Sequence, residues 1–232
     1  ITSGALIRAA VPLSESAALE SGEAMLTNDT PVTWDGGKVR GRRVLRLGAI
    51  ELSSTPVRPD PVRARHVALE AVRSGGLDVA SLTKNGESLR RRLALAHRVF
   101  GDPWPDVSDE ALLARAEEWL DLDALAAGRG SDATSGLRGL LGWRESARLD
   151  EVVPETITVP SGSRIRIDYP EPGSDTSPVL AVKLQECFGW ADGPTVCDGR
   201  VRVVLHLLSP ARRPLAVTDD LASFWASVYP AV

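Results

Sequence analysis

Cysteine, histidine, methionine and aromatic residues are all scarce in this 232-residue chain. It contains two cysteines, three histidines and one methionine, and 5% of its residues are aromatic. Two cysteines cannot build the disulfide framework of a small secreted protein. A zinc site made from Cys187, Cys197 and His206 would need a fourth ligand and has no CxxC or HxxxH pairing. We therefore predict no metal site and no catalytic residue, and interpret Cys187 as a small buried apolar side chain.

Long apolar runs and a strong net charge are also missing. No apolar run in the sequence approaches the ~20 residues of a membrane helix, and no N-terminal segment has the charge and apolar pattern of a signal peptide. We therefore expect a cytoplasmic protein without a membrane partner. The formal net charge is only −4 at pH 7. Any nucleic-acid-binding function must then depend on local clusters of charge.

Sequence motifs for nucleotide hydrolysis are absent as well. Gly36-Gly37-Lys38 lacks the first glycine and the Ser or Thr of the phosphate-binding loop GxxxxGK[ST]. The run Asp109-Glu110-Ala111-Leu112 has letters in common with a DEAH motif. It lies at a predicted helix start, however, where acidic residues are expected on electrostatic grounds. We expect no hydrolysis of ATP by this chain alone and no cofactor bound within it.

Hydrophobic patterns predict an α+β fold in three regions: 1–58, 59–150 and 151–232. The first is predicted to be β-rich, since residues 30–34 and 38–47 are strand-like and are joined by Asp35-Gly36-Gly37, a strong hairpin signal. Residues 5–12 are also strand-like. A sequence that starts inside an element suggests a piece of a longer protein.

The second region is predicted to be helical and the third to be mixed α/β. Asp60-Pro61 has the cap and first-turn proline of a helix start. In the third region we predict strands at 156–159 and 164–169 and a helix over 178–188. Residues 200–229 then predict a strand, a tight turn, a second strand and a helix capped by Thr218.

Cationic side chains at two-residue spacing are the remaining functional signal. On a flat sheet, guanidinium groups spaced in this way would follow a phosphate backbone, and Trp34 or Trp190 would stack on bases beside them. Arginines on strand faces are also often solvated or paired with carboxylates, so this alternative stays open. The predicted nucleic-acid-binding residues are Lys38, Arg40, Arg42, Arg46, Arg164, Arg166, Arg200, Arg202, Arg212 and Arg213.

Six segments carry a family resemblance. PSGSRIRIDY (160–169), PVLAVKLQECFGW (178–190) and RVRVVLHLLSPARRPLAVTDDLASFWASVYP (200–230) resemble the C-terminal, non-motor region of HrpB-type bacterial ATP-dependent helicases, DEAH/DExH-box proteins grouped with RNA helicases. RRVLRLGAIEL (42–52), SLRRRLALAHRVFGDPWPDVSDEALLARAEEWL (88–120) and TITVPSG (156–162) resemble the same family in the same order.

The resemblance implies a longer protein whose motor lies before Ile1. Two RecA-like motor domains would bind ATP and Mg²⁺, and a winged helix and a helical bundle would follow them. Residues 1–58 would then form part of an OB-like barrel. We expect this chain to act as an auxiliary region that contacts RNA and braces the motor domains in cis. The alternative is a protein-interaction module that docks a partner through an apolar helix face with Phe224 and Trp225.

Overall fold

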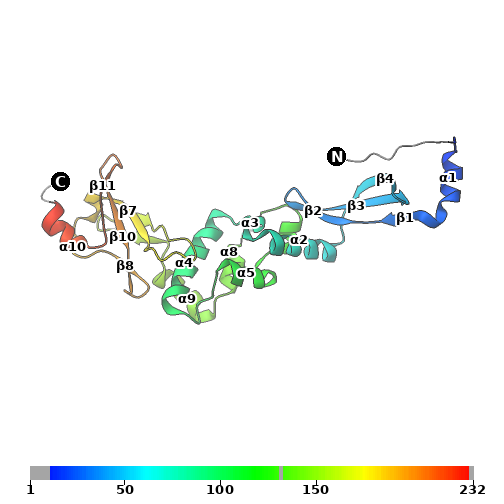
Figure 1. Ribbon diagram of the computed structural model, residues 1–232. Helices are drawn as coiled ribbons and strands as arrows, with labels where there is room; N and C mark the ends of the chain where they lie inside the picture. Colours follow the sequence, from blue (N-terminus) through cyan, green and yellow to red (C-terminus); the bar gives the residue numbers. More distant parts are fainter. Residues whose placement is uncertain (1–10, 131–132, 230–232) are drawn as a thin grey trace.

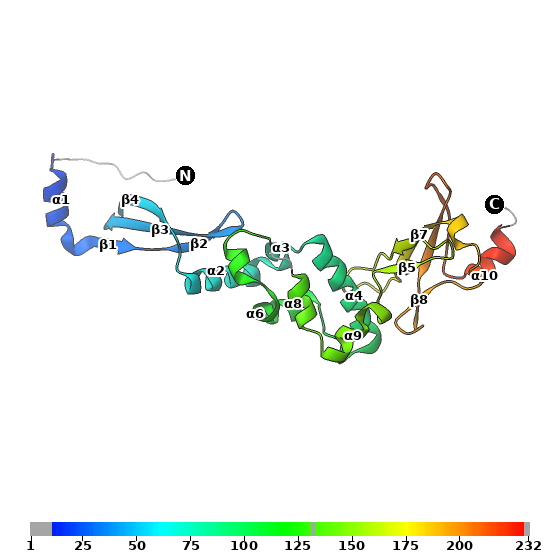
Figure 2. The same ribbon diagram turned by 180° about the vertical axis from the view of Figure 1, so that it is seen from behind.

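A computed structural model of the chain describes residues 11–130 and 133–229. The molecule is elongated, with β-sheets at its two ends and helices between them (Figure 1). The same arrangement is seen from behind (Figure 2), where the N-terminal sheet and the C-terminal helix α10 lie at opposite ends. Helices and strands are both abundant, which confirms the predicted α+β class. The strand predicted over residues 5–12 lies outside the described residues, apart from its last two.

The N-terminal sheet is built around the long strand β3. Strands β1 and β2 pair in succession along one edge of β3, and β4 pairs along the other, all antiparallel. Gly36 and Gly37 connect β2 to β3 with φ of +57° and +78°, so the predicted hairpin is confirmed. The elements are α1 (Glu15–Ser21), η1 (Glu23–Met25), β1 (Leu26–Asp29), β2 (Val32–Asp35), β3 (Lys38–Leu47) and β4 (Ile50–Val57).

This sheet is open. In the described part of the chain, β1, β2 and β4 pair only with β3, so no strand closes the sheet into a barrel. The OB-like barrel therefore stays a prediction. Val39 and Val44 are the buried apolar residues of β3, and the strand is packed against helix α2 (Pro61–Gly75) near its hairpin end.

The middle of the molecule is helical. The carboxylate of Asp60 accepts a hydrogen bond from the backbone N–H of Arg63 at 3.0 Å, and Gly76 ends α2, so the predicted start signal is confirmed. The helices that follow are α3 (Leu77–Ala80), α4 (Lys84–Phe100), α5 (Asp109–Ala114), α6 (Ala116–Trp119), α7 (Leu122–Ala126), α8 (Thr134–Gly139) and α9 (Trp143–Val152).

Helix α4 joins the helical region to the C-terminal region. Its apolar side chains Leu89, Leu93 and Ala96 are buried. Two of its three consecutive arginines are buried too, and each ties α4 to another segment. Arg90 donates from Nε to the carbonyl oxygen of Val107 at 2.9 Å, and Arg92 donates to the carbonyl oxygen of Val153. These arginines therefore hold the fold together and are not available to a ligand.

The C-terminal region holds short strands and a mixed three-stranded sheet. In this sheet β10 lies between β7, which is parallel to it, and β11, which is antiparallel. The other strands form the hairpins β5–β6 and β8–β9. The elements are β5 (Thr156–Thr158), β6 (Arg164–Arg166), β7 (Val179–Lys183), η2 (Leu184–Cys187), β8 (Thr195–Val196), β9 (Val201–Arg202), β10 (Val204–Leu208), β11 (Pro214–Thr218), α10 (Leu221–Ser223) and η3 (Phe224–Val228).

The helix predicted over residues 178–188 is wrong. This segment forms strand β7 followed by the short 3-10 helix η2. Leu180 and Val182 are buried while Ala181 between them is exposed, which is the two-residue period of a strand. The competing helical spacing of Leu180, Leu184 and Cys187 was overridden because pairing with β10 satisfies the backbone of residues 179–183.

The strand predicted after Arg200 shows the expected alternation of buried and more exposed side chains, but it is divided into two strands, β9 and β10. Val203, Leu205 and Leu207 are fully buried. The chain leaves the β8–β9 hairpin at Val203 and enters the β7–β10–β11 sheet at Val204.

The capping residue predicted for the last helix is wrong. Asp220, not Thr218, accepts the hydrogen bond from the backbone N–H of Ser223, at 2.9 Å. The hydroxyl of Thr218 instead accepts from the backbone N–H of Asp220, at 3.0 Å. Thr218 therefore ends β11 and turns the chain toward the helix.

Candidate nucleic-acid interface

The four predicted cations of β3 lie in the N-terminal sheet, and three of them already have partners. Arg40 forms an ion pair with Asp35 at 2.8 Å, and Arg46 pairs with Glu51 at 3.5 Å. Arg42 donates from Nε to the hydroxyl of Ser54 at 2.7 Å. Lys38 is exposed beside the hairpin turn and has no carboxylate partner among the described residues. Trp34 is half-buried against the core and is not a free stacking surface.

The cations of β6 and β9 lie in the C-terminal region, far from β3 (Figure 1). Arg164 donates to the hydroxyl of Thr156 at 3.0 Å, and Arg166 pairs with Glu155 at 3.5 Å. The guanidinium carbon of Arg200 lies 4.8 Å above the ring centroid of Phe100, a cation–π contact. Arg202 is exposed on β9 and has no ion-pair partner in the described part of the chain.

Arg212 and Arg213 lie in the tight turn between β10 and β11, as predicted. Ser209 closes this turn: its carbonyl oxygen accepts from the N–H of Arg212 at 2.8 Å, and its N–H donates to the carbonyl oxygen of Arg213 at 2.8 Å. Arg212 has φ of +60°, a conformation that non-glycine residues seldom adopt outside tight turns. Both side chains are exposed. Within residues 11–130 and 133–229, neither has a carboxylate partner.

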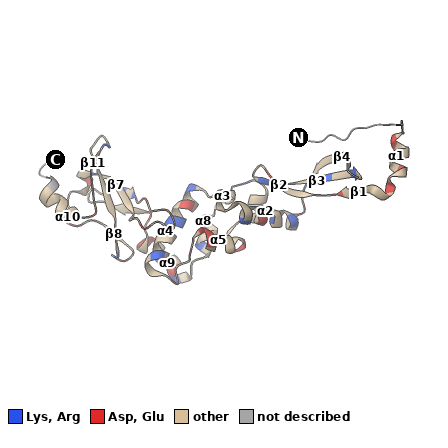
Figure 3. Ribbon diagram, in the orientation of Figure 1, with Lys and Arg blue, Asp and Glu red and all other residues tan. Residues whose placement is uncertain are grey.

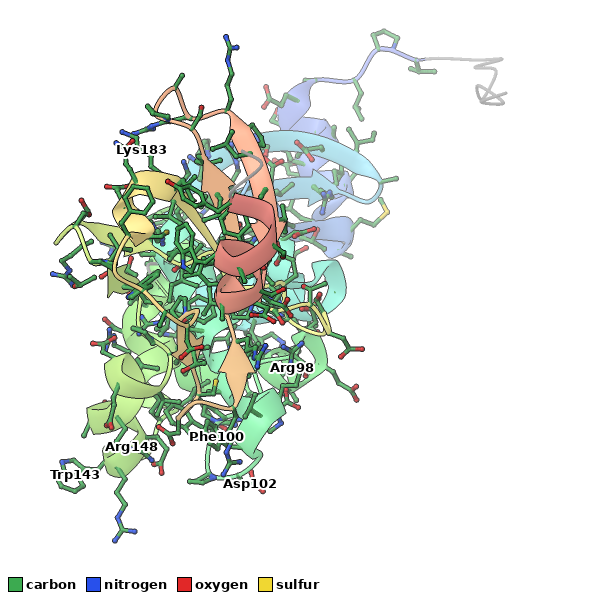
Figure 4. All side chains as sticks on the ribbon, turned by 90° about the vertical axis from the view of Figure 1, so that its left-hand side faces the viewer. Arg98, Phe100, Asp102, Trp143, Arg148 and Lys183 are labelled. Carbon is green, nitrogen blue, oxygen red and sulfur yellow. The ribbon has the colours of Figure 1, made fainter. Side chains whose placement is uncertain are left out.

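Lys183 is a cation that the sequence prediction missed. Leu208 on β10 pairs with Lys183 on one side and with Pro214 on the other, so Lys183 and the arginine turn share one end of the sheet. Figure 4, which looks onto this end of the molecule, labels Lys183 at its upper left side. We call Lys183, Arg212 and Arg213 the cationic cluster. The alternation of apolar and other residues over 179–183 indicated a strand, and a strand would have placed Lys183 at a sheet end. This indication was lost when the segment was interpreted as a helix.

The ten predicted cations do not form one groove. Positive and negative residues are interspersed along the molecule (Figure 3), and the predicted cations occupy both of its ends. Salt bridges or hydroxyl contacts hold five of them. The cationic cluster differs because its three positive residues, which have no carboxylate partners among the described residues, share the end of one sheet.

Aromatic rings occupy the same end of the molecule. Phe188 follows η2 directly and is 50% exposed, and Tyr229 is 41% exposed. Their ring centroids are 6.0 Å apart. Trp225 lies between them and the core, and its indole N–H donates to the carbonyl oxygen of Trp190 at 2.9 Å. We call Phe188, Phe224, Trp225 and Tyr229 the aromatic cluster.

The two cysteines are buried, protonated thiols. Burial is the main cause that raises the pKa of Cys187 to about 11, with a smaller rise from Glu186. Burial likewise raises the pKa of Cys197 to about 11, with a further rise from Asp198. Neither thiol is a nucleophile at neutral pH.

Among the described residues, no three His, Cys, Asp or Glu side chains are grouped closely enough to hold a metal ion. None of the helices in this part of the chain has the length and apolar character needed to cross a membrane.

Comparison with known proteins places this fold in a class. The family described as "ATP-dependent helicase C-terminal" matches residues 116–232. The match begins at α6 and includes the cationic and aromatic clusters. The fold is therefore that of the C-terminal region of an ATP-dependent helicase.

Two kinds of relative identify the family. The ATP-dependent RNA helicase HrpB of Escherichia coli (strain K12) is 41% identical over an alignment of 207 positions that covers 85% of this chain and 25% of that protein. The crystal structure of the E. coli DExH-box NTPase HrpB matches with a TM-score of 0.69 and 37% identity, over 95% of this chain and 28% of that one. A crystal structure of the E. coli DEAH/RHA helicase HrpB matches with a TM-score of 0.67 and 39% identity, over 90% and 27%.

This chain belongs to the HrpB family and corresponds to the C-terminal region of its helicases. The resemblance seen in the sequence is thereby confirmed. The chain spans about a quarter of the length of the relatives that it matches.

Proposed function

We propose that this chain is an RNA-contacting auxiliary region of an ATP-dependent RNA helicase and that the cationic cluster makes its main RNA contact. The observation that carries the proposal is the set of three side chains, Lys183, Arg212 and Arg213, that have no carboxylate partner among the described residues and share one sheet end. Arg212 and Arg213 are exposed and Lys183 is half-buried. Cations without a carboxylate partner gain from pairing with phosphates because counterions are released when they bind.

The paired cations contribute less. Arg40, Arg46 and Arg166 must each leave a carboxylate to meet a phosphate, so the gain from the new contact is offset by the loss of the old one. Arg42 and Arg164 bond to hydroxyl groups and are intermediate. Lys38, Arg200 and Arg202 are exposed but stand apart from the cluster.

The motor functions belong to the longer protein in this proposal. ATP and Mg²⁺ bind in its motor domains, and the helical region with its buried Arg90 and Arg92 serves as a stiff support that positions the C-terminal end against that motor. The described residues support a bracing role through one continuous hydrophobic core, which extends from Val39 in β3 to Phe224 in η3. A cytoplasmic location stays a prediction.

The alternative function, docking of a protein through Phe224 and Trp225, has less support. Phe224 is 3% exposed and Leu221 is 1% exposed, so most of this helix face packs into the core. Within the described part of this helix face, a partner protein could then contact little more than the edge formed by the exposed rings of Phe188 and Tyr229.

Fluorescence anisotropy with a labelled single-stranded RNA tests the proposal. We expect the double variant Arg212→Ala/Arg213→Ala to bind about tenfold more weakly at low salt. The slope of log K against log salt should become shallower by about 1.4, because two phosphate contacts are lost. The matched control is Arg40→Ala/Arg46→Ala, which removes two arginines that are already paired and should change the affinity less than twofold. Equal affinity of the first variant and the unmodified chain at every salt concentration would refute the proposal.

A further inference from the structure

The aromatic cluster is a rigid surface that is open to solvent. Phe224 is its buried floor, and its ring centroid lies 5.3 Å from that of Trp225 and 6.4 Å from that of Tyr229. Trp225 and Tyr229 meet edge to face at 5.2 Å, and Phe188 lies 5.8 Å from Trp225. The rings therefore support one another, and Phe188 and Tyr229 are the two exposed members of the cluster.

A π-helical turn creates this arrangement. Residues 224–228 are wound so that hydrogen-bonded residues are five positions apart, and the backbone N–H of Tyr229 donates to the carbonyl oxygen of Phe224. This wider turn places Tyr229 beside Phe224 and keeps Trp225 next to both. Single π-helical turns cost stability relative to an α-helix and are found frequently at functional sites.

The cationic cluster and the aromatic cluster are joined by one short turn. Lys183 is the N-cap of η2, and Phe188 is its C-cap. A cation that shares the end of the sheet with Arg212 and Arg213 is thus four residues of 3-10 helix away from an exposed ring. Glu186 lies in the same turn, so the four charged groups have a net charge of +2, from three cations and one carboxylate. The turn η2 therefore connects Lys183 of the cationic cluster to the exposed ring of Phe188.

We propose that an unpaired RNA base stacks on the exposed rings of Phe188 and Tyr229 while Lys183, Arg212 and Arg213 hold the adjacent phosphates. This inference rests on the proposed function and adds to it that the RNA is single-stranded at this site. Aromatic rings stack on any base because every base has a flat π-face, and a positive surface beside them follows the backbone. In a duplex the base faces are covered by neighbouring base pairs, so a helix can pair with the cations but cannot use the rings.

The test compares three RNA ligands of equal length: a single strand, the same backbone with abasic sites, and a duplex. Phe188→Leu keeps an apolar side chain in place but removes the ring. We expect it to bind the single strand about tenfold more weakly, with an unchanged salt slope and unchanged affinity for the abasic and duplex ligands. Phe188→Tyr keeps a ring and should bind all three as the unmodified chain does. Circular dichroism of each variant checks that it is folded.

Trp143→Ala is the matched control. Trp143 is 85% exposed and, in Figure 4, points into solvent at the opposite edge of the face that carries Lys183. Its removal should leave single-strand affinity unchanged. If Trp143→Ala and Phe188→Leu weaken binding equally, stacking is not confined to the aromatic cluster and this inference is wrong.

The remaining outcomes separate the two proposals. If Phe188→Leu binds the single strand normally while Arg212→Ala/Arg213→Ala weakens it, base stacking is wrong and the RNA-contacting function stands. If neither variant changes affinity, both proposals fail.

Discussion

Arg92 of α4 donates a hydrogen bond from Nε to the carbonyl oxygen of Val153, 2.6 Å away. Its side chain is 4% exposed, and a terminal nitrogen also pairs with Asp150. Val153 follows the last helix of the central region, so one buried guanidinium connects that region to the segment that enters β5. This contact is one of several between α4 and the segments that follow it, together with the ion pair of Arg91 with Asp168.

Removal of this contact should destabilise the chain strongly. Arg92→Ala leaves the buried carbonyl of Val153 without a donor and leaves a cavity in place of the arginine side chain. We expect a loss of about 2–4 kcal/mol in the free energy of unfolding, measured by urea denaturation. Arg144→Ala, at an exposed position on α9, should change it by less than about 0.5 kcal/mol. If Arg92→Ala lowers the free energy of unfolding by less than about 1 kcal/mol, the contact contributes little to stability.

Two glycines of α8 should respond in opposite directions to substitution by alanine. A Cβ on Gly136 would lie 1.7 Å from the carbonyl oxygen of Trp119, so Gly136→Ala must push α8 away from α6. We expect a loss of about 2–3 kcal/mol or more. Gly139 in the same helix has no atom within 4 Å of such a Cβ. Gly139→Ala should raise stability by about 0.5 kcal/mol because alanine favours the helix. The melting temperature of both variants is measured by thermal unfolding. Equal changes in melting temperature would contradict the close approach of Gly136 to Trp119.

The buried thiols should make stability depend on alkaline pH. Burial raises the pKa of Cys187 and of Cys197 from 9.0 to about 11 in the folded chain. The folded state therefore holds these protons more tightly than the unfolded state. Their contribution is fully present below pH 9 and is lost as the pH rises through 11, at up to about 2–3 kcal/mol per thiol.

Cys187→Ala should reduce the loss of stability between pH 9 and 11, as measured by urea denaturation at each pH. At pH 8, both thiols of the folded chain should react slowly with a thiol reagent and should react fast in denaturant. Fast reaction of either cysteine without denaturant would contradict its burial.

The hydrogen bond of Trp225 should contribute to stability without being required for RNA binding. Trp225→Phe removes the indole N–H that bonds to the carbonyl oxygen of Trp190 but keeps an aromatic ring. We expect a loss of about 1 kcal/mol in stability with RNA affinity nearly unchanged, because the exposed rings of Phe188 and Tyr229 remain. If RNA binding falls as far as in Phe188→Leu, Trp225 itself contacts RNA.

Local signals in the sequence predicted local structure well. The hairpin at Asp35-Gly36-Gly37 and the helix start at Asp60-Pro61 are correct because they depend on backbone preferences of a few adjacent residues. The Arg212-Arg213 turn is correct for the same reason. The two predicted boundaries between the three regions stay predictions, and α9 continues past residue 150 to Val152.

The errors come from competition that only distant contacts settle. Residues 178–188 have helical and strand periodicity at once, and the parallel partner β10 decides for the strand. That error hid Lys183. The sequence also did not show which cations are paired, because strand pairing brings Glu155 beside Arg166 and Glu51 beside Arg46.

The sequence by itself determined the family of this protein, its α+β class and the turn that carries Arg212 and Arg213, since each is written in adjacent residues. Only the tertiary structure decided which charged groups are neutralised and which remain exposed. It placed Lys183 beside the arginine turn through the register of β7 with β10, and it brought Phe188 to Tyr229 across 41 positions of the chain. Both placements depend on packing between segments that are distant in sequence, which no local pattern contains.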